Sequence, residues 1–231
     1  MLRPTLDPYP SILCTVDVVL LTLVADALCV GLLRREAHPF AGVAALPGGY
    51  VHAQEDADTL ATAARVLESK LGLEAPYLEQ VASFSGPARD PRGWSISVAY
   101  MALVPRERLD SRAQGFSILP VGELPRLPFD HGQIVEVAVA RARNKSAYSS
   151  LPVHFCGEHF TLPELQAVYE AVLGERLNKV SFRRKMAELD MLEPVNGELT
   201  RGQAHRPAQV YRLRRQYQRR LALSERGMGL G

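Results

Sequence analysis

The chain has little cysteine and no long uninterrupted apolar run, and each shortage excludes a class of protein. Its three cysteines are odd in number and far apart, so we expect no disulfide framework and a reducing compartment. The first residues have no apolar core of the kind that a secretory signal requires. The most apolar segment, 16–33, is broken by Asp17 and by Ala25-Asp26, which predicts a strand hairpin and no membrane span. We therefore expect a soluble, cytoplasmic protein.

Charge is unevenly distributed along the chain. Residues 1–150 contain 14 basic and 16 acidic side chains, whereas residues 151–231 contain 13 basic and 9 acidic ones. A basic C-terminal third on a slightly acidic body indicates an anionic partner at that end. On charge alone, a solvated arginine-rich tail explains the excess equally well.

The N-terminal part alternates segments typical of strands and helices, which predicts an α+β fold. Patterns rich in branched apolar residues predict strands at 15–23, 27–33, 79–85, 95–104 and 116–121, and helical patterns cover 58–71 and 130–143. The polar stretch 144–150 then marks a junction that divides the chain into domains 1–150 and 151–231.

The first of these helices has start and stop signals of its own. Asp58 is a predicted N-cap and Gly72 a predicted stop. The spacing of Leu60, Ala64, Leu67 and Leu71 predicts the stripe that faces the core.

The second domain is predicted to be a winged helix. Thr161 and Glu164 form a capping box that begins one helix, and a second helix follows over 179–190. In that second helix Phe182, Met186 and Leu189 share one face and are expected to enter the core. Asn196-Gly197 predicts a hairpin turn, and a strand at 208–213 is expected to close the wing.

A basic helix beside a hairpin is the arrangement that places a helix in the major groove of DNA and a wing next to it. Arg184 is a candidate for guanine and Val180 for a thymine methyl, whereas the other basic residues are candidates for phosphates. The candidate DNA-binding residues are Lys179, Val180, Ser181, Arg183, Arg184 and Lys185 on the helix and Arg201, His205 and Arg206 on the wing. Ordinary surface arginines are the alternative for the helix taken alone.

Residues 46–73 resemble the Nudix box, G-x5-E-x7-R-E-U-x-E-E-x-G-U with U apolar. The landmarks of the box are matched by Gly49, Glu55, Arg65, Leu67, Gly72 and Leu73, with two extra residues between the glutamate and the arginine. The three helical glutamates of the box fall on Val66, Ser69 and Lys70.

Loss of those glutamates predicts that hydrolysis is lost too. Carboxylates at helix positions i, i+3 and i+4 share a face and can jointly hold Mg²⁺, whereas Val66, Ser69 and Lys70 cannot. Glu68 is turned roughly 100–200° away around the helix. We therefore expect no catalytic residues, no metal site and no required cofactor. Arg34, Arg35, Arg89 and Arg92 could still bind a pyrophosphate.

The order of the two parts resembles the Nudix-related transcriptional regulator family, NrtR. The resemblance is carried by 160–174, by Asn178-Lys-Val-Ser-Phe-Arg-Arg-Lys-Met186 and by His205-Arg-Pro-Ala-Gln-Val-Tyr-Arg212, and it extends over nearly the whole chain. It implies a Nudix-like α/β/α sandwich for effector sensing and dimerisation, followed by a winged helix-turn-helix domain.

The resemblance also implies a function, that of a homodimeric bacterial repressor of NAD-biosynthesis or salvage genes. Such a protein binds a palindromic double-stranded DNA operator and is released by ADP-ribose. The family's effector pocket involves the loop before Pro47-Gly-Gly and the segment Asp90–Gly93. The candidate effector-binding residues are then Arg34, Arg35, Gly48, Gly49, Glu55, Arg65, Asp90 and Arg92.

Two other functions stay open at this point. One is an active hydrolase of ADP-ribose or nucleoside diphosphate derivatives with an appended nucleic-acid-binding domain, which Val66, Ser69 and Lys70 disfavour. The other is a nucleotide-binding scaffold whose basic tail meets RNA or a protein, which the order of helix, turn, helix and wing disfavours.

Overall fold

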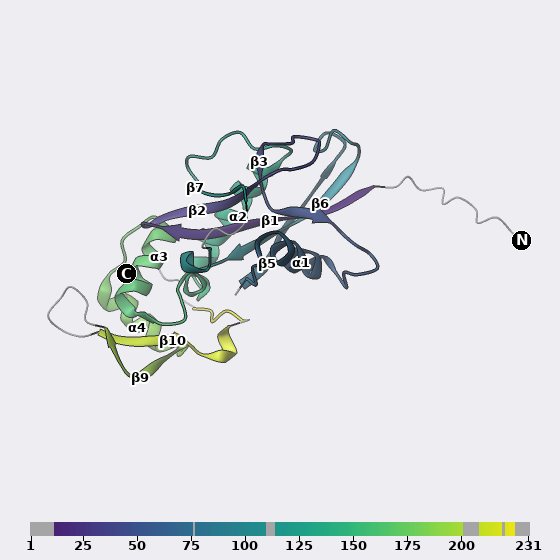
Figure 1. Ribbon diagram of the computed structural model, residues 1–231. Helices are drawn as coiled ribbons and strands as arrows, with labels where there is room; N and C mark the ends of the chain where they lie inside the picture. The colour runs from purple at the N-terminus through teal and green to yellow at the C-terminus, as the bar shows by residue number, and fades with distance from the viewer. Residues whose placement is uncertain (1–11, 76, 110–113, 201–207, 219, 225–231) are drawn as a thin grey trace, which may run out of the picture.

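A seven-stranded sheet forms the body of the N-terminal domain (Figure 1). The computed structural model describes residues 12–75, 77–109, 114–200, 208–218 and 220–224. The sheet has the order β3-β2-β1-β6-β5, with β4 paired to β1 and β7 paired to β2. Its strands are β1 (Leu13–Val24), β2 (Ala27–Arg34), β3 (Ala44–Ala45), β4 (Gly48–Tyr50), β5 (Tyr77–Gly86), β6 (Ser95–Leu103) and β7 (Phe116–Pro120). The longer strands confirm the sequence prediction, whereas β3 and β4 are too short to show a periodic pattern.

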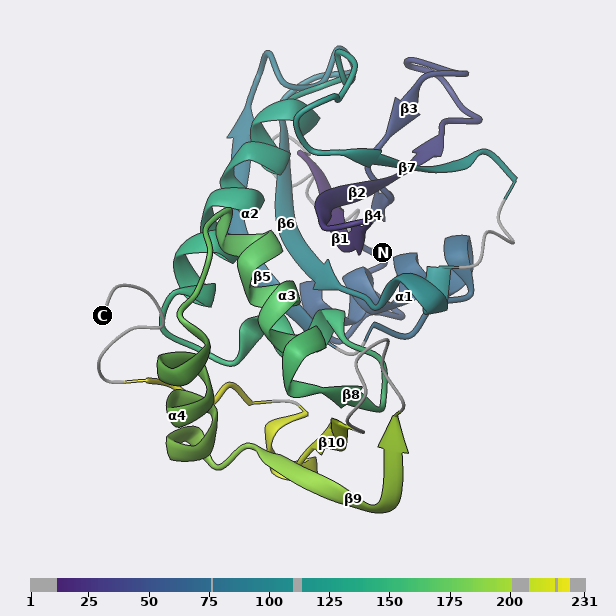
Figure 2. The same cartoon turned by 90° about the vertical axis from the view of Figure 1, so that its left-hand side faces the viewer.

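The central strand β1 contributes side chains to two separate cores, one on each face of the sheet. Successive side chains of a strand point to opposite faces. Val16, Val18 and Leu20 therefore pack with α1 (Thr59–Leu71), and Val19 and Leu21 pack with α2 (His131–Ser146). The two helices cover opposite faces (Figure 2), which confirms the predicted α/β/α sandwich.

Strand β1 includes Asp17, as the predicted strand at 15–23 does, so this residue interrupts the apolar run but not the strand. The strand continues through Asp17 in parallel register with β6, where Asp17 lies opposite Ala99. Only the break at Ala25 and Asp26 is a turn, and both residues there have positive φ angles of 46° and 65°.

Helix α1 begins and ends where the sequence predicts but is rotated from its predicted orientation. Asp58 accepts a hydrogen bond from the Ala61 amide at 2.7 Å, and Gly72 ends the helix in the left-handed conformation. The buried residues are Thr62, Ala63, Val66 and Leu67, whereas Leu60 is 45% exposed. The stripe predicted from Leu60 and Ala64 is therefore wrong, because the small residues Thr62 and Ala63 turn inward. Leu60 and Ala64 instead line a surface groove with Leu78.

The C-terminal domain has a core and a sheet of its own. It contains β8 (Phe160–Thr161), α3 (Leu162–Leu173), α4 (Lys179–Leu189), β9 (Leu192–Thr200) and β10 (Ala208–Leu213), preceded by the 3-10 turn η2 (Leu151–Phe155). The sheet order is β8-β10-β9. The predicted capping box is confirmed, because the Glu164 amide donates to Thr161 Oγ1 and the Thr161 amide donates to the Glu164 carboxylate.

The hairpin turn predicted at Asn196-Gly197 is wrong. Strand β9 continues through both residues. It pairs with β10 over 192–194 and again over 199–200, with a register shift between the two stretches. The strand ends at Thr200 and the next begins at Ala208, so the Asn-Gly pair coincides with a bulge-like irregularity of the ladder and not with the chain reversal. Strand β10 has the predicted bounds.

The two domains pack through α2 and α3, which lie side by side on one face of the sheet (Figure 2). Leu151, Phe155 and Val172 enter the core that contains α2. The buried Tyr169 hydroxyl donates to the carbonyl of Ser149 at 2.9 Å and links α3 to the end of α2. Among the described residues, no helix combines the length and the apolar character that crossing a membrane requires.

Candidate anion pocket and nucleic-acid-binding face

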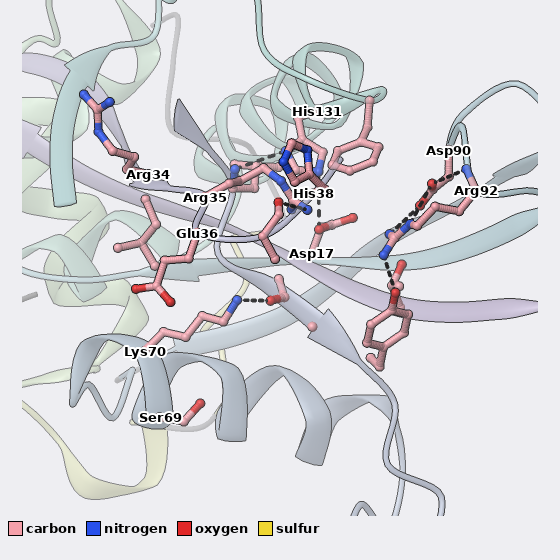
Figure 3. Close-up of a pocket in the computed structure, with 18 of the residues that line it drawn as sticks. Asp17, Arg34, Arg35, Glu36, His38, Ser69, Lys70, Asp90, Arg92 and His131 are labelled. Carbon is pink, nitrogen blue, oxygen red and sulfur yellow. Dashed lines mark hydrogen bonds and ion pairs between the residues drawn. The ribbon is translucent and has the colours of Figure 1, made fainter. Parts of the chain in front are cut away.

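A pocket of about 570 Å³ opens where α1, α2, β1 and β4 meet (Figure 3). Six of the eight candidate effector residues line it, namely Arg34, Arg35, Gly48, Gly49, Asp90 and Arg92. Gly48 fits there because a Cβ atom at this position would lie only 2.3 Å from a carboxylate oxygen of Asp17. The sequence did not identify Tyr50 and Phe129 as parts of the wall.

Three cations of this pocket are bonded only to backbone carbonyls. Arg34 donates to the carbonyl of Gly42 at 3.0 Å, Arg35 to that of Pro39 at 2.9 Å, and Lys70 to that of Gly48. None of the three forms an ion pair with a carboxylate within the part of the chain that the structure describes. A cation without a counterion has charge available for an anionic ligand.

The charges in the pocket act on one another. Partial burial, followed by the nearby charge of Arg92, lowers the pKa of Arg35. Partial burial, followed by the charge of Arg35, likewise lowers the pKa of Lys70. The Arg35 guanidinium lies 4.8 Å from the centre of the Phe129 ring. An anion placed between Arg35 and Lys70 would relieve their repulsion.

Arg92 differs from these three because its charge is already paired. Its guanidinium binds both oxygens of Asp90, at 3.0 and 2.7 Å, and it lies 5.5 Å from the centre of the Tyr50 ring. The pKa of Asp90 lies below its ordinary value, mainly because the Arg92 side chain donates hydrogen bonds to this carboxylate. The pair therefore presents a fixed donor edge beside an aromatic ring.

A buried polar network forms the floor of the pocket, and sequence reasoning missed most of it. Asp17 accepts a hydrogen bond from the Ser97 hydroxyl at 2.7 Å and lies 3.4 Å from both Arg89 and His131. Arg89 also binds both oxygens of Asp130, at 2.9 and 2.8 Å. The one available signal was an acidic residue within an apolar strand.

The environment of Asp17 determines its charge. Burial by itself would raise the pKa of this carboxyl, but the charge and hydrogen bond of His131 lower it. Ser97 and Arg89 lower it further, and the net shift is downward. The Leu46 amide lies 3.1 Å from Nδ1 of His131, and Nε2 of the same ring lies 3.4 Å from Asp17.

Two of the candidate effector residues lie outside the lining of this pocket. Arg65 binds both oxygens of Asp56 at 2.7 Å and the carbonyl of Tyr50 at 2.9 Å. This pairing keeps the pKa of Asp56 well below its ordinary value. Glu55 is exposed and interacts with His52 at 2.9 Å. Arg65, whose role the sequence left open, thus connects Asp56, in the loop after β4, to Tyr50 at the end of that strand.

The residues that replace the Nudix glutamates do not fit a divalent cation. Val66 is 1% exposed, and a Cβ atom on Gly49 would lie 3.0 Å from its side chain. Ser69 and Lys70 line the pocket, whereas Glu68 lines the groove on another side of α1. Within the described ranges there is no group of three or more His, Cys, Asp or Glu side chains placed to hold a metal.

Helix α4 presents a basic, exposed face in the orientation predicted from the sequence. Phe182 and Met186 are each 3% exposed, whereas Val180 is 77% exposed on the opposite side. Arg183 and Arg184 are exposed, and Arg184 lies 3.7 Å from Glu188. Lys179 is exposed as well, while Ser181 and Lys185 are half-buried. The wing candidates Arg201, His205 and Arg206 lie outside the described residues.

Comparisons with known proteins match both parts of this architecture. Residues 152–213 match the family described as the NrtR DNA-binding winged helix domain. A protein of Acinetobacter baylyi described as "ADPR responsive transcriptional repressor NtrR" is 39% identical over 209 residues, which cover 88% of this chain and 83% of that protein.

Two solved structures of Shewanella oneidensis NrtR are also similar. One is a complex with a 27mer DNA, which is 34% identical, has a TM-score of 0.86, and is matched over 94% of this chain and 99% of that one. The other is the NUDIX domain complexed with ADP ribose, which is 35% identical, has a TM-score of 0.53, and is matched over 58% of this chain and 92% of that one.

Proposed function

This chain belongs to the NrtR family of transcriptional regulators, and from this premise we propose that it is a repressor whose binding to DNA responds to ADP-ribose. The observation that carries the proposal is the pairing of two sites in one chain. A pocket in one domain holds three cations that form no ion pair with a carboxylate of the described residues, and an exposed basic helix lies in the other domain. An ADP-ribose diphosphate suits the first site and a DNA backbone suits the second.

The proposed effector site comprises the candidate residues that line the pocket. Arg35 contacts the pyrophosphate, Arg34 adds charge at the pocket mouth, and the glycines 48 and 49 let the ligand approach the backbone. Asp90 fixes Arg92, whose guanidinium and neighbouring Tyr50 ring form one wall. Arg65 supports that wall through the Tyr50 carbonyl. For Glu55, which is exposed beside His52, the structure offers no contact with the ligand site.

The proposed DNA site consists of the nine helix and wing residues predicted from the sequence. Half-sites related by two-fold symmetry suit a homodimer that reads a palindrome, because one winged helix makes only a small interface. We retain the division into 1–150 and 151–231, the control of NAD-biosynthesis or salvage genes, and a cytoplasmic location as parts of this proposal.

The two arginines of α4 should respond differently to replacement. Arg184→Ala should cost roughly 1–3 kcal/mol and relax sequence preference at one position of each half-site, because Arg184 reads a base edge. Arg183→Ala should weaken binding to all sequences about equally and flatten its salt dependence, because a phosphate contact is lost. Competition binding with operator variants at several salt concentrations measures both. Exchanged outcomes would mean that α4 docks in another rotation than the burial of Phe182 implies.

We also propose that the pocket does not hydrolyse its ligand. Val66, Ser69 and Lys70 cannot position the metal that would activate a water molecule on a pyrophosphate. Incubation of the protein with ADP-ribose and Mg²⁺ or Mn²⁺ should release no AMP above background. Turnover near about one per second, an ordinary enzymatic rate, would restore the hydrolase as the function.

A binding assay with the promoter beside the protein's own gene, with and without ADP-ribose, separates the three functions. A repressor binds the promoter specifically and is weakened by the ligand. A hydrolase consumes the ligand, and a scaffold for RNA or protein shows no specific binding to the promoter.

A further inference from the structure

The face of α1 that carries metal ligands in a Nudix box holds an ammonium group in this chain. Lys70 extends from α1 toward β4, where it donates to the carbonyl of Gly48 (Figure 3). Its side chain lines the same pocket as Arg35 and Arg92. No carboxylate among the described residues forms an ion pair with it.

We propose that the Lys70 ammonium takes the place of a divalent cation, so that the pocket binds the diphosphate of ADP-ribose without metal. This inference rests on the proposed function and identifies which group supplies the charge at its effector site. An ammonium carries a positive charge and three N–H donors, of which only one is used by the Gly48 carbonyl. The remaining donors are available for phosphate oxygens.

The same substitution explains how binding can be separated from cleavage. A divalent cation both neutralises phosphate charge and lowers the pKa of a bound water molecule. A lysine neutralises charge but does not activate water in that way. Arg35 and Lys70 line the same pocket, and burial followed by the charge of Arg35 lowers the pKa of Lys70, while Asp17 and Glu36 oppose that shift. A diphosphate between Arg35 and Lys70 would favour the charged form of both.

Isothermal titration of the full chain with ADP-ribose, in EDTA and in Mg²⁺, tests the inference directly. We expect the two dissociation constants of the unaltered protein to agree within about twofold. A requirement for Mg²⁺ would overturn the inference while leaving an ADP-ribose-responsive repressor intact. Failure to bind ADP-ribose in either buffer would contradict the proposed function itself.

Three substitutions at one position make the test specific for charge. Lys70→Gln should weaken binding in EDTA by about 10- to 100-fold, which is typical of a lost charge-assisted hydrogen bond. Lys70→Arg should recover most of that affinity. Lys70→Glu should bind worst in EDTA and should be the variant that Mg²⁺ improves, because it restores a carboxylate to this face.

Two controls separate the role of Lys70 as a ligand from its structural hydrogen bond to Gly48. Arg143→Gln removes an exposed cation from α2, outside the lining of the pocket, and should not change ADP-ribose affinity. The affinity of Lys70→Gln should also depend less on salt than that of the unaltered protein, since one screened contact is gone. Unchanged affinity of Lys70→Gln, or an unchanged salt dependence, would overturn the inference.

Discussion

Replacement of Arg89 by methionine is expected to lower the free energy of unfolding by about 3–5 kcal/mol, because it leaves buried carboxylates without their cation. The Arg89 side chain is 7% exposed and bonds to Asp130, and it also lies 3.4 Å from Asp17. Methionine keeps the apolar bulk, so the change removes charge and hydrogen bonds more than volume. Urea unfolding at neutral pH measures the loss.

Arg141→Met is the matched control for this prediction. Arg141 also binds a carboxylate, that of Glu79, but its side chain is 43% exposed and Lys145 stays bound to the same carboxylate. The expected loss is therefore below about 1 kcal/mol. If both variants lose the same free energy of unfolding, the Arg89 network contributes no more to stability than a surface ion pair does.

The pH dependence of the Arg89 effect has a definite sign. The pKa of Asp17 lies below its ordinary value of 3.8 in the folded protein, and Arg89 is one cause of that shift. A carboxyl with a depressed folded pKa stabilises the fold above its unfolded pKa and loses that contribution as pH falls through the folded value. The gap in stability between the unaltered protein and Arg89→Met should thus narrow as pH falls from 7 toward about 3. A gap that widens would contradict the assigned role of Asp17.

Local signals predicted the ends of the helices well. Asp58, Thr161 and Gly72 determine where their helices begin or end, because caps depend on residues within one turn. Rotation of a helix is a different matter. The pattern of Leu60 and Ala64 predicted that this side of α1 faces the core. The side that does so carries Val66, which packs close to Gly49, and this contact forms only in the tertiary structure.

The site was predicted only in part, because many of its contacts join residues that are distant in the sequence. Arg34, Arg35 and Arg92 were recognisable as cations beside loops. The partners Asp17, Arg89 and Asp130 are far apart in the sequence and meet only in the folded protein, where the start of α2 contacts β1 and the loop before β6. Similarly, Lys70 and Arg35 line one pocket only because α1 has this rotation, and local sequence patterns do not determine that rotation.

Helix α2 provides a physical connection between the two sites. Its first residue, His131, lines the pocket, and its N-cap residue Asp130 is bound by Arg89. Its other end packs against α3, where Tyr169 is bonded to Ser149. A short segment of chain then leads from α3 to the basic helix α4. These contacts form a continuous path of packed elements from the pocket to α4.

ADP-ribose should weaken operator binding by roughly 5–150-fold, a range that corresponds to the usual coupling between two sites in one protein. A ligand changes DNA affinity only by the difference between its own affinities for the two conformations. Arg35→Ala removes a cation from the pocket but none from α4, so operator affinity should be retained while the response to ADP-ribose is largely lost. Fluorescence anisotropy of a labelled operator, titrated with protein at saturating and at zero ligand, measures both quantities.

Arg143→Ala is the control for the switch, because Arg143 is exposed on α2 outside the pocket. It should retain both the operator affinity and the full response. If saturating ADP-ribose leaves the operator affinity of the unaltered protein unchanged, the pocket does not regulate DNA binding. If Arg35→Ala loses DNA binding in the absence of ligand, the pocket and the DNA-binding face of α4 do not act as two separate sites. If Arg35→Ala retains its operator affinity but loses the response to ADP-ribose, the sensor lies in the pocket and the DNA contact lies on α4.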